Sequence, residues 1–135
     1  MIHDAAKMAQ AKDFSSITLP KRIRPSDLDG VIDLFGKGWV IFELKYGDAT
    51  VPVGQRIMLE NMAKDFETAR KPCMVILASH GASDASQAID VGRAKVTGVY
   101  WHGAWRKPPY AVTLNEMIQT MMGEIDGNKD DTRME

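Results

Sequence analysis

The chain is poor in cysteine and contains no long apolar stretch. Cys73 is the single cysteine among 135 residues, so no internal disulfide can form and a reducing compartment is favoured. The longest unbroken apolar run covers residues 73–78, far short of the roughly 20 residues needed to cross a bilayer. Residues 1–7 lack a basic region followed by an apolar stretch, so we expect no secretory signal, no membrane partner and a cytoplasmic location.

The chain also lacks a large excess of either charge. It has 17 lysine and arginine residues against 18 aspartate and glutamate residues, a net charge of −1. This balance excludes a protein that coats nucleic acid through bulk charge, although a local basic surface is compatible with it. Its apolar fraction of 44% and charged fraction of 26% are typical of a globular domain. We expect a single domain over residues 1–124 and a polar, flexible tail over residues 125–135.

Apolar periodicity and turn residues predict helices and strands in a mixed order. A capping-box pattern, Thr113 to Glu116, opens the last helix, and Glu60 and Lys64 are spaced for an i,i+4 pair on the middle one. The expected helices cover residues 2–12, 53–70 and 114–123. The expected strands, of which the last is an outer strand, cover residues 16–19, 29–35, 39–45, 73–78 and 93–101. This order predicts an α/β fold in which a mixed β-sheet is flanked by helices.

The expected hairpin of residues 29–45 carries an unusual set of charges on one face. Side chains alternate between the two faces of a strand, so Glu43 and Lys45 share a face of the second strand. A three-residue loop at residues 36–38 would pair Glu43 with Val31, with an aspartate two residues to either side on the same face. A two-residue loop would change the parity and separate these groups.

The two flanking aspartates are Asp29 and Asp33, so three carboxylates and one ammonium are expected to converge. Like charges at such distances repel, and burial makes the repulsion more costly. A divalent cation removes the conflict, and Mg²⁺ prefers a few carboxylates together with retained water. We therefore predict a magnesium site at Asp29, Asp33 and Glu43, in which Mn²⁺ can substitute. Lys45 would contact a phosphate or orient the attacking water.

The same residues resemble a known family. An aspartate, Asp29 or Asp33, followed by the Glu-Leu-Lys triplet at residues 43–45, is similar to the motif of the PD-(D/E)xK nuclease superfamily. The order of expected elements over residues 2–78 also resembles the restriction-endonuclease-like αβββαβ core of that superfamily. The resemblance implies a metal-dependent DNA nuclease that hydrolyses phosphodiester bonds, with an aspartate and the glutamate on the metal and the lysine in catalysis.

Two aspartates compete for the role of main metal ligand. In the RecB-like branch a Gly-x-x-Asp motif carries the ligand, which selects Asp33 from the stretch that begins at Gly30. In other members the aspartate often follows a proline directly, whereas here Pro25 lies four residues before Asp29. Both aspartates therefore stay candidates.

Gln55 strengthens the resemblance to the VRR-type, RecB-like and Holliday-junction-resolvase branch, whose members carry a glutamine on the helix after the motif. On the expected helix, Gln55 begins a stripe that continues with Leu59, Met62 and Phe66. A polar residue on a buried stripe needs partners. Gln55 is thus a candidate site residue, with a satisfied structural amide as the alternative.

Two basic groups flank the hairpin and are candidates for contacts with DNA phosphates. They consist of Lys21, Arg22 and Arg24 before it, and Arg93 and Lys95 after it. The short chain favours a homodimer, and paired sites would suit structure-specific endonuclease action on branched DNA. Small nucleases of this kind resemble those of bacteria and their phages. The alternative is a non-catalytic DNA-binding or assembly module that retains the nuclease fold.

Overall fold

A five-stranded sheet forms the centre of the protein. The computed structural model describes residues 13–81 and 88–127. The strands lie side by side in their order along the chain, and of the four adjacent pairs only β2 and β3 are parallel. They are β1 (Gly30–Asp33), β2 (Trp39–Tyr46), β3 (Cys73–His80), β4 (Lys95–Trp101) and β5 (Ala104–Arg106). The expected mixed sheet is therefore confirmed.

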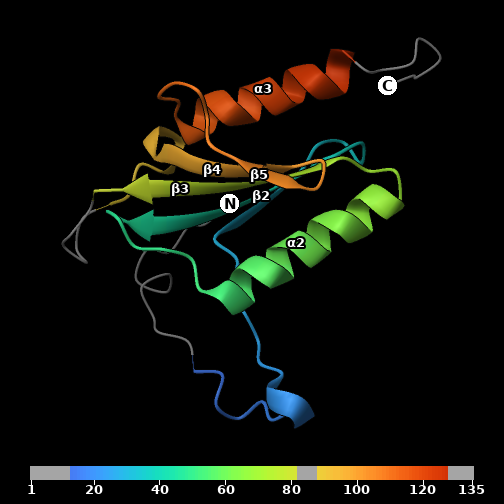
Figure 1. Cartoon of the computed structure of the whole chain (residues 1–135), viewed down its shortest axis with the longest axis vertical. Coiled ribbons are helices and arrows are strands. Elements are labelled where there is room, and N and C mark those ends of the chain that lie inside the picture. Colours follow the sequence, from blue (N-terminus) through green and yellow to red (C-terminus); the bar gives the residue numbers. More distant parts are fainter. Residues whose placement is uncertain (1–12, 82–87, 128–135) are drawn as a thin grey trace.

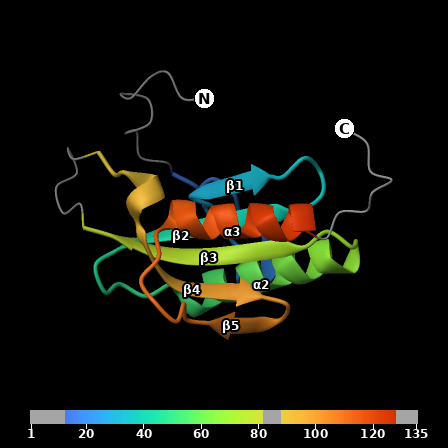
Figure 2. The same cartoon turned by 90° about the horizontal axis from the view of Figure 1, so that it is seen from above.

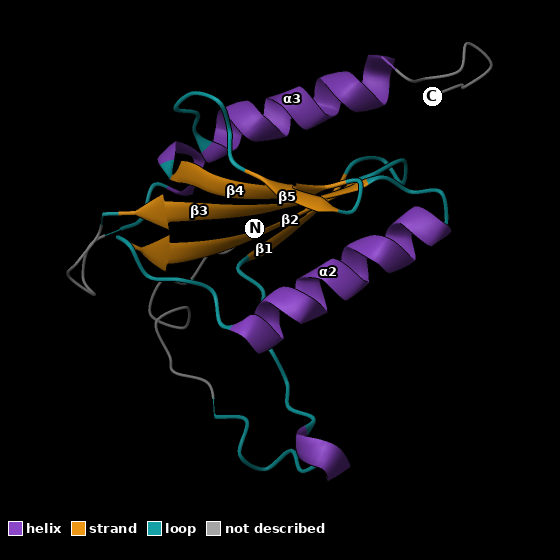
Figure 3. Cartoon of the chain, viewed as in Figure 1, coloured by secondary structure: helices purple, strands orange, loops and turns teal. Residues whose placement is uncertain are grey.

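Helices cover both faces of this sheet. α2 (Val53–Thr68) joins the parallel strands and packs on one face, while α3 (Leu114–Gly127) lies across the other (Figures 1 and 3). Seen from above, β1 and β5 form the two edges (Figure 2). Two short 3-10 turns, η1 (Pro20–Arg22) and η2 (Val91–Arg93), complete the elements of the described ranges. No helix in these ranges combines the length and apolar character that a bilayer span requires.

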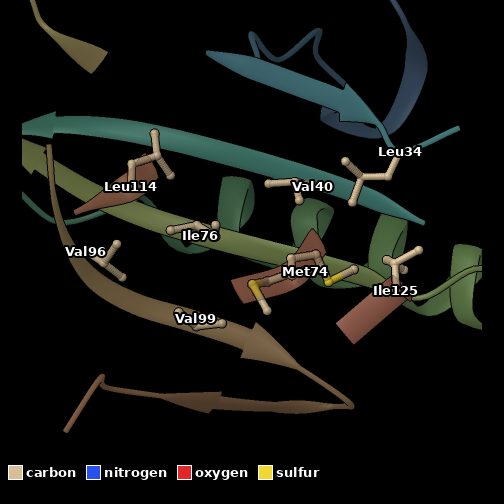
Figure 4. Close-up of a cluster of buried hydrophobic side chains, with 9 residues drawn as sticks. Leu34, Val40, Met74, Ile76, Val96, Val99, Leu114 and Ile125 are labelled. Atoms are coloured by element: carbon tan, nitrogen blue, oxygen red, sulfur yellow. The ribbon is translucent and has the colours of Figure 1, made fainter. Parts of the chain in front are cut away.

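Each face of the sheet packs against its helix through a separate cluster of buried apolar side chains. β2 and β3 are buried on both parities because helices cover both of their faces. The cluster toward α3 is shown in Figure 4 and consists of Leu34, Val40, Met74, Ile76, Val96, Val99, Leu114, Met121 and Ile125. The cluster toward α2 consists of Ile41, Leu59, Ala63, Cys73, Val75 and Tyr100. Burial, with a contribution from nearby Glu67, raises the pKa of the Cys73 thiol to about 12, so this cysteine is an apolar packing residue.

Most of the expected elements form close to their predicted positions. α2 ends two residues before the expected boundary, β3 continues two residues further, and α3 continues to Gly127. The capping box is formed: the Thr113 N–H donates to Glu116 Oε1 over 2.8 Å, and the Glu116 N–H donates to Thr113 Oγ1 over 3.1 Å. Local sequence patterns specify the two helices well because the backbone hydrogen bonds of a helix join residues close in sequence, and the start of α3 has its own cap.

The segment before β1 differs from the prediction. Residues 16–19 form no strand, and an irregular chain leads into η1, where Lys21 and Arg22 have positive φ values of 61° and 62°. Ile17 and Leu19 are about half exposed, at 49% and 51%. A strand needs a hydrogen-bonding neighbour, and the described sheet pairs none with this segment.

The other differences are at the borders of the domain. The expected outer strand 93–101 begins at Lys95. It is not the edge of the sheet, because β5 pairs with it on the outer side. The expected helix 2–12 lies outside the described residues, as does the predicted tail beyond Gly127. The expected domain end at residue 124 falls inside α3, whose Ile125 is part of the core.

The hairpin between β1 and β2 has a different register from the expected one. Asp33 pairs with Trp39, and the Leu34 N–H donates to the Gly38 carbonyl over 2.9 Å, so the three-residue loop is residues 35–37. Phe35, 82% exposed, has a φ of 58° and leaves the strand. The expected loop length is right, but the loop lies one residue earlier and the pairing shifts by two residues. A shift of two preserves the face on which each side chain lies.

Candidate active site

The candidate residues lie at the end of the sheet where the parallel strands finish. β2 and β3 are joined by α2, so their carboxyl ends and the first turn of α2 meet at one end of the molecule (Figure 1). In open α/β sheets, ligands bind in the crevice at the carboxyl ends of such strands. This end of the sheet carries a cavity of about 370 Å³ beside Lys45.

Glu43 is the centre of the arrangement. It is 4% exposed and is the only buried charged residue in the described ranges. Its Oε2 accepts a hydrogen bond from Gln55 Nε2 over 2.7 Å, and its Oε1 accepts one from the Asp29 N–H over 3.3 Å. Burying a carboxylate is unfavourable without such partners. Gln55 on α2 and the residue that precedes β1 thus each hold one of its two oxygens.

Asp29 faces Glu43 from the beginning of β1. The last regular pair of the ladder joins Gly30 to Phe42, so Asp29 is the next residue outward, opposite Glu43. Asp29 Oδ2 accepts a hydrogen bond from the Leu44 N–H over 2.6 Å. None of the described residues donates a hydrogen bond to Asp29 Oδ1. One oxygen of this carboxylate is therefore fixed by β2.

Lys45 completes the set on the same face of β2. Its Nζ lies 3.9 Å from Glu43 Oε2, and its side chain is 28% exposed. It also lines the 370 Å³ cavity, so its ammonium lies between the buried carboxylate and the solvent. The structure thus brings together Asp29, Glu43, Lys45 and Gln55.

The electrostatics of the site are unbalanced toward negative charge. Burial, followed by the charge of Asp29, raises the pKa of Glu43 above its ordinary value. The hydrogen bonds from Gln55 and the Asp29 N–H, and the charge of Lys45, act in the opposite direction but do not cancel the shift. A cation beside Glu43 would favour its ionised form.

Asp33 is not part of this arrangement. In the observed register it lies opposite Trp39, four residues and about 13 Å along β1 from Asp29. Its Oδ1 accepts a hydrogen bond from the Gly36 N–H over 2.7 Å, which stabilises the hairpin turn. The expected three-carboxylate cluster is therefore replaced by a pair, and Asp29 is the aspartate that meets Glu43.

Asp29 and Glu43 are the two carboxylates that could hold a cation at this site. The described ranges contain no group of three or more His, Cys, Asp or Glu side chains placed to share an ion. Mg²⁺ in proteins commonly takes one or two carboxylates and completes its octahedron with water and substrate phosphate. Asp29 and Glu43, which lie opposite each other at the end of the hairpin ladder, are within that number of carboxylates.

Gln55 acts through Glu43. Its Nε2 donates to Glu43 Oε2 and, over 3.3 Å, to the Asp27 carbonyl. The amide thereby connects α2 to the carboxylate and to the segment that leads into β1. The side-chain amide of Gln55 is therefore hydrogen-bonded within the protein, as the structural alternative expected. It also contacts Glu43, which is a candidate metal ligand.

The two basic groups lie in different places. Lys95 is near the cavity, because Lys45 pairs with Ser79 on β3 and Ser79 pairs with Lys95 on β4, about 10 Å across two strand spacings. Arg93 Nε lies 3.4 Å from Asp90 Oδ2 and is exposed. The other group consists of Lys21, Arg22 and Arg24, which are all exposed. It lies on or beside η1, away from the sheet (Figure 1).

Sequence patterns missed Arg56. It lines the cavity together with Lys45, from the first turn of α2. Its Nε lies 3.3 Å from Glu60 Oε2, so Glu60 pairs with the basic residue at i−4. The expected partner at i+4, Lys64, acts on Glu60 only through its charge. The i,i+4 spacing was the available signal, but it does not reveal which of two basic neighbours an acid selects.

Glu43→Gln is expected to change the pH dependence of folding in the absence of divalent cations. Because the pKa of Glu43 is raised in the folded protein, its stabilising contribution is complete below the unfolded-state value and is lost as the pH rises through the folded-state value. Glutamine does not titrate. The free energy of unfolding of the wild type should therefore fall relative to that of the variant as the pH rises above about 4.5. Urea unfolding in EDTA from pH 4 to 8 measures this, and parallel curves would contradict it.

Comparisons of the chain with protein-family models, with curated protein sequences and with solved structures found no significant match.

Proposed function

We propose that this protein is a metal-dependent DNA nuclease that hydrolyses phosphodiester bonds. The observation that carries the proposal is the buried Glu43, which faces Asp29 and has Lys45 Nζ 3.9 Å away at the end of two parallel strands. A buried Glu43 that faces Asp29 does not stabilise a sheet, because burial and the charge of Asp29 both raise the pKa of Glu43 and oppose its ionisation. Residues with such perturbed pKa values beside a cavity are candidates for function.

Each residue has a role that follows from its position. Asp29 and Glu43 would hold the magnesium ion, Asp29 through Oδ1, the oxygen that does not accept the Leu44 N–H. When bound, the ion lowers the pKa of a water ligand and offsets charge on the phosphate. Gln55 keeps the Glu43 carboxylate oriented, and the Leu44 N–H does the same for Asp29.

Lys45 would act on the reacting phosphate. In hydrolysis the water oxygen forms a bond to phosphorus, one P–O ester bond breaks, and the leaving alkoxide takes up a proton. Negative charge accumulates on the phosphate oxygens as this happens. The Lys45 side chain is partly exposed and lines the cavity, and its ammonium could donate hydrogen bonds to those oxygens.

The proposal extends to the family and the assembly. The Asp29 position, the Glu-x-Lys triplet on β2, the crossover helix α2 and the parallel β3 support membership of the PD-(D/E)xK superfamily with its restriction-endonuclease-like core. The proposed partner is DNA, cut by endonuclease action, and the proposed assembly is a homodimer whose two sites would suit branched substrates.

A cleavage assay tests the function. Purified protein is incubated with linear, nicked, flap and four-way DNA in magnesium, in manganese and in EDTA. We expect cleavage of at least one substrate with either metal and none in EDTA, with Glu43→Gln inactive in all three conditions. If no substrate is cut with either metal, the non-catalytic DNA-binding or assembly module becomes the better account.

A further inference from the structure

The cavity beside Lys45 has a second cation that the proposed chemistry does not use. Arg56 lines it from α2, together with residues 47–51 of the loop that follows β2. Two hydrogen bonds tie this loop to the end of β3: the Gly47 N–H donates to the His80 carbonyl over 3.0 Å, and Ser79 Oγ donates to the Gly47 carbonyl over 2.8 Å. One wall of the cavity is therefore held in place.

Arg56 is held in a defined orientation by two partners. Its Nε contacts Glu60 Oε2, and its guanidinium carbon lies 5.7 Å from the centre of the Trp105 ring. The Trp105 Nε1–H also donates to Glu60 Oε2, so the three side chains form one connected group. A guanidinium oriented in this way loses less conformational freedom when it binds an anion.

The remaining lining of the cavity suits one unit of a nucleic acid strand. Val51, Leu77 and Ala78 provide apolar surface, and Lys45 and Arg56 provide positive charge, with the carboxylate of Asp48 as the acidic side chain of the lining. A deoxyribose presents carbon atoms to such a surface, while its phosphate requires cations. A guanidinium can bind two phosphate oxygens at once.

The geometry points to this cavity as the site of the phosphate next to the one that is cut, with Arg56 as the residue that binds it. The inference rests on the proposed nuclease function, since Lys45 separates the cavity from Glu43 and would itself contact the reacting phosphate. The strand would then pass over the carboxyl ends of β2 and β3, in the direction of Lys95 on β4.

DNA binding without metal tests the inference. The probe is a fluorescein-labelled DNA duplex of 20 base pairs, and the dissociation constant is measured by anisotropy in EDTA at several salt concentrations. Arg56→Gln should weaken binding about 10-fold and lower the slope of log K against log salt by about 1, because one phosphate contact is lost. Arg56→Lys should keep the slope, since it keeps the charge. Lys64→Gln, an equal charge change at an exposed position two turns along α2, should alter neither.

The outcomes separate this inference from the proposed function. If Arg56→Gln binds DNA as the wild type does, or if Lys64→Gln weakens binding equally, the phosphate site is wrong even when the wild type cleaves DNA. If Arg56→Gln shows the expected loss but the wild type cleaves nothing in magnesium or manganese, the DNA contact stands and the nuclease proposal fails.

Discussion

Lys45→Ala is expected to lower the rate of DNA hydrolysis in magnesium by about 100-fold or more, because it removes a charged donor that matters most as charge builds on the phosphate. In the free protein the charge of Lys45 is partly offset by the nearby Glu43 carboxylate. Its loss should therefore change the affinity for DNA only a few-fold. Single-turnover cleavage measures the rate, and anisotropy in EDTA measures the dissociation constant.

A matched control distinguishes this effect from a general loss of positive charge. Lys64→Ala removes an ammonium from an exposed position on α2 and should cleave at the wild-type rate. Lys45→Ala should also keep its response to magnesium, because it leaves both carboxylates in place. A variant that cleaves as fast as the wild type would remove Lys45 from the mechanism.

Glu43→Gln is expected to abolish both cleavage and the stabilisation of the fold by magnesium. A ligand that binds only the folded state stabilises it by about 2.7 kcal/mol at 100 times its dissociation constant. The wild type and Lys45→Ala should show this as a rise in thermal midpoint of several degrees, and Glu43→Gln should not. Thermal unfolding followed by circular dichroism, with magnesium or with EDTA, measures it.

The two aspartates provide the sharpest control for the metal site. Asp29→Asn should lose the magnesium response, whereas Asp33→Asn should keep it, because an asparagine oxygen can still accept the hydrogen bond from the Gly36 N–H in the turn. The opposite result would show that Asp33 is the ligand and that the register of the hairpin differs in solution. A magnesium response that survives in both Glu43→Gln and Asp29→Asn would place any metal elsewhere.

The candidate site was partly predictable because its parity is local. Alternation along β2 places Glu43 and Lys45 on one face whatever the neighbouring strand does. Helical spacing places Gln55 on the side of α2 that faces the sheet, and it donates to Glu43. Period and parity arise within a few residues, so the sequence determines them directly.

The register of the hairpin was not predictable in the same way. Loops at residues 35–37 and 36–38 are equally long and leave every side chain on the same face. The observed loop has an unfavourable feature, because it places Phe35 at positive φ and exposes its ring. It also has a favourable one, because Leu34 is buried in the cluster under α3. That balance depends on a helix about 80 residues later in the chain, and it decided which aspartate meets Glu43.

The sequence by itself therefore determined the types of α2, α3 and β1 to β4, the capping box before α3, and the face of β2 on which Glu43 and Lys45 lie. Only the tertiary structure decided that the site contains a pair of carboxylates and not three. It also decided that residues 16–19 form no strand and that Arg56 is oriented by Trp105. The physical reason is the distance along the chain: these outcomes depend on contacts between residues far apart in sequence, whose energies no local pattern records.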